Sequence, residues 1–321
     1  GYIYLPEFYA DWEQPNGARC ADDVAKEIQK LKTENIDGII MDLRNNGGGS
    51  LFDVIQMVGL FIDEGPVVQV KDRDGNPSVL RDKDKGVLYD GPLAVMVNEF
   101  SASASEIFAA AIQDYHRGII IGSTSTYGKG TVQRNIGLDA TRSLLPGSGD
   151  DGASLGTVKL TLQKFYRING GSTQLKGVTP DIILPDKLEY LKLREKDNPD
   201  ALKWDEIWKA KYTPWSTQAS VNAVSKVEEE RINNSTVFNE IKKNAELLSK
   251  LNDGVYTLNL KKYQEEQKEI RNIAKQMESL TKSEKENPVE LLSADVNKFA
   301  SDTAKQERQN IWLKGLKTDI Y

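Results

Sequence analysis

The stretch Ser101-Ala-Ser-Ala-Ser-Glu-Ile-Phe-Ala-Ala-Ala-Ile-Gln-Asp114 predicts a buried helix with a serine at its start. Its apolar residues recur at the spacing that lines one face of an amphipathic helix. Ser103 takes the expected N-cap, and Glu106 three residues later completes a capping box. A serine in this position is most often only a cap, so the stretch alone leaves two roles open for Ser103, a helix cap and a nucleophile.

Short apolar runs on both sides of this helix predict strands. Residues 36–43 and 93–97 precede it, and residues 118–122 follow it. Residues 156–168 alternate well enough to predict a long strand with one buried face. Residues 21–33 have the spacing of a surface helix. Because strands and helices interleave, this part of the chain is expected to be α/β.

The character of the sequence changes near Asp186. After it Lys and Glu dominate, Gly is scarce and helical patterns recur, which indicates packed helices. A length of 321 residues is typical of two domains. We therefore expect one domain over residues 1–186 and a helical domain over residues 187–321. Within the first, the Gly-, Ser- and Asp-rich residues 138–153 predict a mobile loop.

The overall composition is that of a soluble globular protein, with 39% hydrophobic and 28% charged residues. A net charge of −6 gives no indication of nucleic-acid binding. No apolar run approaches the roughly 18 residues of a membrane span. The single cysteine, Cys20, excludes an intrachain disulfide and leaves the redox compartment open.

A glycine-rich loop, Asp42-Leu-Arg-Asn-Asn-Gly-Gly-Gly49, follows one of the predicted strands. Glycines let neighbouring backbone N–H groups converge, so such a loop can hold an anion such as the oxyanion of acyl transfer. A plain tight turn is the alternative. The spacing fits neither a dinucleotide-binding fingerprint nor an NTPase phosphate loop.

A second loop, Gly122-Ser-Thr-Ser-Thr-Tyr-Gly-Lys-Gly130, places Lys129 between two glycines. It lacks the Ser or Thr that binds magnesium in a phosphate loop, so we reject ATP binding. A lysine can deprotonate a serine only when it is neutral, which requires burial in an apolar pocket. Gln133 could then accept a hydrogen bond from the amine and orient it. A surface lysine is the alternative for Lys129.

Other common catalytic groups are disfavoured. The one histidine, His116, lies the length of the serine helix from Ser103, about 20 Å away. One His and one Cys without ligand spacing do not make a zinc site. Pairs of carboxylates are too numerous to exclude. We expect no metal and no cofactor.

Three motifs occur in one order along the chain, and together they resemble the C-terminal processing peptidases, also called tail-specific proteases. They are Asp42-Leu-Arg-x-Asn-x-Gly-Gly49, Ser101-Ala-Ser-Ala-Ser-Glu106 and Tyr127-Gly-Lys-Gly-Thr-Val-Gln133. Residues 164–181 resemble the end of that protease domain in its large bacterial periplasmic branch. The charged tail is similar to the helical extension of that branch, so the resemblance covers nearly the whole chain.

The resemblance implies a Ser-Lys dyad and an acyl-enzyme mechanism. Ser103 would be the nucleophile, Lys129 the general base and Gln133 the residue that orients it. The backbone N–H groups of Gly49 and Ala104 would form the oxyanion hole. The implied fold is a mixed-sheet protease core of the ClpP/crotonase type followed by an all-α domain.

The resemblance also implies a serine endopeptidase that cleaves proteins near their C-termini. Its partners would be proteins with exposed C-termini and an adaptor lipoprotein, and its location the periplasm or cell envelope of a bacterium. A non-catalytic binding or scaffold module on the same fold is the alternative.

The chain departs from the family pattern in two ways. The turn before Gly128-Lys-Gly130 carries one extra residue. The family also has a PDZ domain and, in this branch, a helical region ahead of the strand predicted for Gly1-Tyr-Ile-Tyr-Leu5. We therefore expect a processed or truncated chain without these regions.

Overall fold

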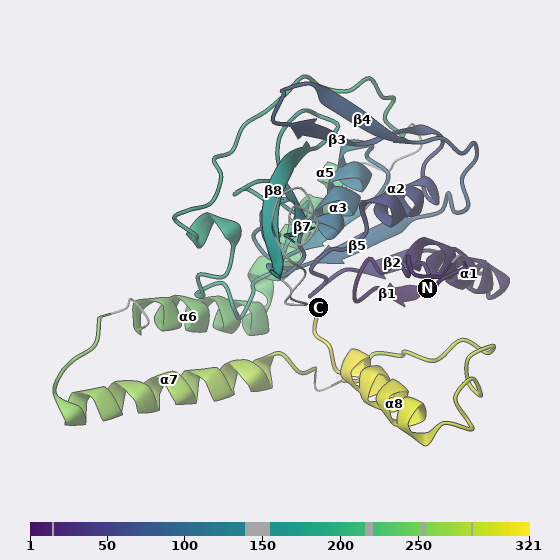
Figure 1. Ribbon diagram of the computed structural model, residues 1–321. Helices are drawn as coiled ribbons and strands as arrows, with labels where there is room; N and C mark the ends of the chain where they lie inside the picture. Colours follow the sequence, from purple (N-terminus) through teal and green to yellow (C-terminus); the bar gives the residue numbers. More distant parts are fainter. Residues whose placement is uncertain (15, 139–154, 216–220, 252–254, 284) are drawn as a thin grey trace.

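The computed structural model describes residues 1–14, 16–138, 155–215, 221–251, 255–283 and 285–321 (Figure 1). Its first part is built on a five-stranded sheet in which every pair of neighbouring strands is parallel. In spatial order the strands are β1 (Tyr2–Tyr4), β2 (Ile39–Asp42), β5 (Leu93–Val97), β6 (Ile119–Gly122) and β9 (Ile182–Ile183). Parallel neighbours need crossover connections, and the connections between β1, β2, β5 and β6 each include a helix. These helices are α1 (Cys20–Thr33), α2 (Leu51–Gly59) and α3 (Ala104–Asp114).

A second sheet of four antiparallel strands packs on the other side of α2 and α3 (Figure 1). In spatial order it contains β4 (Pro77–Asp82), β3 (Gly65–Asp72), β8 (Thr157–Tyr166) and β7 (Thr131–Gly137). The predicted mixed α/β class is confirmed, with parallel and antiparallel pairing in separate sheets. The loop predicted at residues 138–153 lies almost entirely outside the described residues.

Helix α3 lies between the two sheets. It contacts β6 on one side and β3 on the other, and every residue of α3 except Gln113 is buried. The sequence predicted one buried face for this helix, and the structure buries both faces. Phe108 and Ile112 are fully buried, and burying a side chain of this size stabilises the fold by about 1.5–3 kcal/mol.

The expectation of one buried face along residues 156–168 is wrong for the first part of β8. Val158, Leu160 and Leu162 alternate correctly but are 37–43% exposed. The reason is that β7 and β8 pair with each other over their whole length, whereas only the end of β8 pairs with β3 and reaches the core.

The helices predicted for residues 187–321 are present, and among the described residues of this part the α-helices lie between Val221 and Lys317. These helices are α5 (Val221–Asn234), α6 (Thr236–Leu251), α7 (Leu260–Leu280) and α8 (Thr303–Lys317), after a short 3₁₀ turn, η1 (Glu195–Asp197). Helices α5, α6 and α7 contribute to a second apolar cluster, in which Ile241 and Leu248 of α6 pack with Ile182 of β9. The helical region therefore docks on the edge of the parallel sheet. No helix among the described residues combines the length and apolar character needed to cross a bilayer.

Between β9 and α5 the chain runs back over the first part. The Ala210 N–H donates to the Ile168 carbonyl, the Trp215 N–H donates to the Tyr115 carbonyl, and Ala210 belongs to the first apolar cluster. A domain boundary near Asp186 remains our proposal, with the segment that follows it bound to the first part of the chain.

Candidate active site

Ser103 occupies the N-cap of α3 in a strained backbone conformation. Its φ is 56° and its ψ is −110°. A positive φ with this ψ is rare for any residue other than glycine and costs on the order of 1–3 kcal/mol, so it persists only where the surroundings hold it. Strain of this kind is concentrated at functional sites. The side chain of Ser103 remains partly exposed while the residues beside it are buried.

The glycine-rich loop after β2 packs directly against this serine. A Cβ atom on Gly48 would lie 2.8 Å from the Ser103 Cβ and 3.0 Å from the Ala104 nitrogen. Asn46 holds the loop in place, because its carbonyl accepts hydrogen bonds from the Ala102 N–H (3.0 Å) and the Ser105 hydroxyl (2.9 Å). The sequence predicted that the glycines let backbone N–H groups converge on an anion, but it did not predict that Gly48 packs against the serine itself.

The two backbone N–H groups that the sequence predicts for an oxyanion hole are those of Gly49 and Ala104. Within the described part of the chain, neither the Gly49 nor the Ala104 N–H donates an intramolecular hydrogen bond. The Gly48 N–H is occupied by the Asn46 side chain (2.9 Å). The Ala104 N–H lies in the first turn of α3, where the helix dipole favours negative charge.

The buried carboxylate of Glu106 joins the serine loop to the lysine loop. One oxygen accepts from the Ser103 N–H (2.8 Å) and the Lys129 N–H (2.9 Å). The other accepts from the Thr126 hydroxyl (2.6 Å) and the Gly128 N–H (2.7 Å). Glu106 is fully buried. Sequence reasoning gave it only a capping role, and the loop contacts have no local sequence signal.

Burial raises the pKa of the Glu106 carboxyl to about 7. The hydrogen bonds from Thr126 and from the backbone of Ser103, Gly128 and Lys129 act in the opposite direction, because they stabilise the ionised form. The group that joins the two loops therefore titrates close to neutral pH.

Lys129 lies between two glycines because another segment packs against their backbone. A Cβ on Gly128 would lie 3.1 Å from the carbonyl carbon of Leu175, and a Cβ on Gly130 would lie 2.6 Å from the Gln174 nitrogen. The buried Gln174 side chain also accepts from the Gly130 N–H (2.8 Å). The Lys129 side chain is half-buried, and its amine has no hydrogen bond or ion pair among the described residues.

Gln133 is exposed on β7, and its amide donates to the Thr161 hydroxyl at 3.4 Å. No hydrogen bond joins it to Lys129 among the described residues. The structure thus brings Ser103, Ala104, the glycine loop and the Lys129 loop together, and places the Gln133 amide on a neighbouring strand.

The remaining serines of the motif have structural contacts. The buried Ser101 hydroxyl donates to the Leu43 carbonyl (2.8 Å), and the buried Ser105 hydroxyl donates to Asn46. His116 is exposed just beyond the end of α3 farthest from Ser103. Among the described residues no group of three or more His, Cys, Asp or Glu side chains is arranged to bind a metal.

The contact between Gly48 and Ser103 makes a testable prediction. Gly48→Ala should lower catalytic activity on the order of a hundredfold, because the added methyl group must displace the serine or the loop and φ at this position is +102°. Gly47→Ala is the matched control, since a Cβ there meets nothing within 4 Å. Peptide cleavage and the melting temperature of both variants should be measured. Equal activity of Gly48→Ala and Gly47→Ala would show that the close contact between Gly48 and Ser103 is not needed for activity.

Comparison with known proteins assigns the chain to a family. A family model described as peptidase family S41 matches residues 1–184, more than half of the chain. The chain belongs to peptidase family S41. A second model, described as the C-terminal domain of tail specific protease, matches residues 188–321. The proposed boundary near Asp186 lies between the two matches.

Individual S41 relatives match parts of the chain. It is 46% identical over 210 residues to a tail-specific protease of Haemophilus influenzae, covering 65% of this chain and 28% of that protein. It is 39% identical over 165 residues to a carboxy-terminal-processing protease of Bartonella bacilliformis, covering 51% and 35%. A solved structure of a photosystem II D1 C-terminal processing protease matches with a TM-score of 0.46 at 27% identity, covering 57% and 42%. The chain thus spans only 28–35% of these two curated relatives.

Proposed function

We propose that this chain carries the catalytic centre of a serine endopeptidase that cleaves proteins near their C-termini. The observation that carries the proposal is the Glu106 carboxylate, which binds the backbone of both Ser103 and Lys129 and so holds their two loops together. Family membership supports the reaction class.

In the proposed reaction the Ser103 oxygen attacks the carbonyl carbon of the scissile peptide bond. Lys129 in its neutral form takes the serine proton as the new C–O bond forms. The N–H groups of Gly49 and Ala104 bind the oxyanion. Lys129 then gives the proton to the leaving amine, the C–N bond breaks and an acyl-enzyme remains. In the second half, Lys129 takes a proton from water as the water oxygen bonds to the ester carbonyl carbon. The C–O bond to Ser103 then breaks, Lys129 returns the proton to the serine oxygen, and the carboxylic acid product leaves.

The surroundings of Lys129 support its role as a base. No carboxylate forms an ion pair with its amine among the described residues, so no such contact competes with the Ser103 hydroxyl for the amine. We keep Gln133 as the proposed orienting residue. The contact of its amide with Thr161 is long and weak, so reorientation toward Lys129 when substrate binds would cost little.

The substrate class and partners are proposed from the relatives. The names of two of them refer to tail-specific and carboxy-terminal processing, so we propose proteins with exposed C-termini as substrates. From the family resemblance we also propose the bacterial periplasm or cell envelope as the location and a lipoprotein as an adaptor.

A fluorophosphonate probe tests the proposed nucleophile. The probe should label the protein at Ser103, and Ser103→Ala should abolish labelling, because the probe reacts only with an activated serine. Ser78→Ala is the matched control, since Ser78 is exposed and distant from the motif. Mass spectrometry of the labelled peptide locates the adduct, and a metal chelator should leave the labelling unchanged. A protein that neither reacts with the probe nor cleaves unfolded substrates would instead be a binding module.

A further inference from the structure

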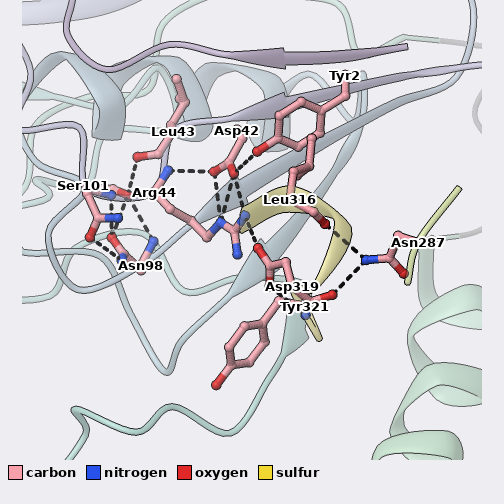
Figure 2. Close-up of polar contacts among 11 residues, drawn as sticks. Tyr2, Asp42, Leu43, Arg44, Asn98, Ser101, Asn287, Leu316, Asp319 and Tyr321 are labelled. Carbon is pink, nitrogen blue, oxygen red and sulfur yellow. Dashed lines mark hydrogen bonds and ion pairs between the residues drawn. The ribbon is translucent and has the colours of Figure 1, made fainter. Parts of the chain in front are cut away.

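Arg44, near the start of the glycine-rich loop, is bound from two sides (Figure 2). Its guanidinium donates to the buried Asp42 carboxylate, with Nε at 2.9 and 3.0 Å and Nη2 at 2.6 Å. The same Nη2 lies 2.7 Å from Oδ2 of Asp319, which follows α8 in the helical region. The pair is largely shielded from solvent, with Arg44 19% and Asp319 22% exposed. Partial burial reduces the screening of such a contact.

Asp319 is itself held by the helical region. Its carbonyl accepts from the Asn287 amide (2.8 Å), and its other carboxylate oxygen accepts from the Tyr321 N–H (2.9 Å). The Tyr321 hydroxyl donates to the Pro185 carbonyl (3.0 Å). These bonds, most of them visible in Figure 2, hold the Asp319 carboxylate in place independently of its contact with Arg44.

On its other side Arg44 is continuous with the active-site loops. The next residue, Asn45, donates its N–H to the Asn98 side chain (2.9 Å), which donates back to the Asn45 side chain (3.0 Å). The Asn98 N–H donates to the Ser101 hydroxyl (2.9 Å). Asn46, one residue further, holds Ala102 and Ser105 through its carbonyl. Hydrogen bonds of Asn45, Asn46 and Asn98 therefore connect the residues next to Arg44 with residues on both sides of Ser103.

We propose that Asp319 is a positioning residue through which the helical region holds the glycine loop against Ser103. Asp42 alone can neutralise the charge of Arg44, so the main effect of Asp319 is to fix the orientation of the guanidinium. It does so by binding Nη2 from the side of the helical region. The catalytic part of this inference rests on the proposed function. A displacement of about 1 Å in the loop can cost on the order of a hundredfold in rate.

A second ion pair between the two regions supplies a matched control. Lys30 on α1 lies 3.0 Å from Asp295, and this pair has no contact with the glycine loop. Asp319→Asn and Asp295→Asn each remove one carboxylate charge from an ion pair between the same two regions, with no change in side-chain size. A loss of general anchoring would affect the two variants alike.

In the full chain, kcat and KM for a peptide substrate should be measured together with amide hydrogen exchange over residues 44–50. Asp319→Asn should lower kcat on the order of tenfold with little change in KM, and should speed exchange in the glycine loop. Asp295→Asn should do neither, and Asp319→Glu should restore part of kcat.

Equal losses in both Asn variants, or unchanged kcat and exchange in Asp319→Asn, would overturn the positioning role. The exchange measurement stands apart from the proposed function. If the parent protein is not labelled by fluorophosphonate, the protease proposal fails. Faster loop exchange confined to Asp319→Asn would still support the Asp319 contact as the restraint on the loop.

Discussion

Ser103→Ala and Lys129→Arg are each expected to abolish cleavage of unfolded protein while leaving the fold intact. Without the Ser103 oxygen no acyl-enzyme can form, and a guanidinium at position 129 stays protonated and cannot take a proton. The loss should be on the order of 10⁴-fold or more in kcat. Cleavage assays and circular dichroism of the purified variants measure both parts of the prediction.

Lys159→Arg is the control for the lysine change, because Lys159 is exposed on the neighbouring strand β8. It should keep the activity of the parent protein. Because residues of one catalytic unit are not additive, the double variant Ser103→Ala with Lys129→Arg should be no less active than either single variant. Substantial activity in either single variant would rule out the proposed dyad.

Glu106→Gln is expected to have the second large effect. The glutamine amide nitrogen would have to replace one carboxylate oxygen, and each of those oxygens accepts two hydrogen bonds from N–H or O–H donors. A donor would then face two donors in a fully buried site, at a cost of about 1–3 kcal/mol for each unsatisfied group. We expect proteolysis to fall at least a hundredfold, since the two loops would separate.

Glu278→Gln is the matched control for this change, because Glu278 lies on α7 in the helical region and is 73% exposed. Its melting temperature and activity should remain close to those of the parent protein. Normal proteolysis in Glu106→Gln would show that the shared carboxylate does not hold the dyad together.

The same carboxylate predicts a pH dependence. With a pKa raised to about 7, Glu106 is protonated below that pH and ionised above it. Only the ionised form accepts from all four donors, so activity should rise with pH through about 7.

Deprotonation of a lysine base also raises activity as the pH rises, so an activity profile cannot separate the two groups and the measurement must report on Glu106 directly. The amide proton shifts of Ser103, Gly128 and Lys129, followed from about pH 5 to about pH 9, should titrate with a midpoint near 7. Shifts that stay constant over this range would contradict the prediction.

Features that depend on neighbours in sequence were predictable. The helix after Ser103 follows from apolar spacing and from the cap with Glu106, which are interactions within one or two turns. The α/β class follows from interleaved strands and helices, and the helical second part from its composition. The order of the three motifs was enough to indicate the family, which the comparisons then showed.

Features that depend on contacts across the chain were not predictable. The alternation of β8 shows which side chains share a face, but burial of that face needs a partner, and among the described residues nothing covers its outer half. The apolar spacing of α3 gave one buried face, but a second sheet covers the other. Gly48 reaches Ser103 only because the loop after β2 folds onto the start of α3. The bonds from Glu106 to the Lys129 loop and from Arg44 to Asp319 join residues far apart in sequence. Hydrophobic periodicity and capping residues depend only on a few neighbouring positions in the sequence. Contacts between distant residues are therefore determined only when the sheets, the loops and the helical region pack together.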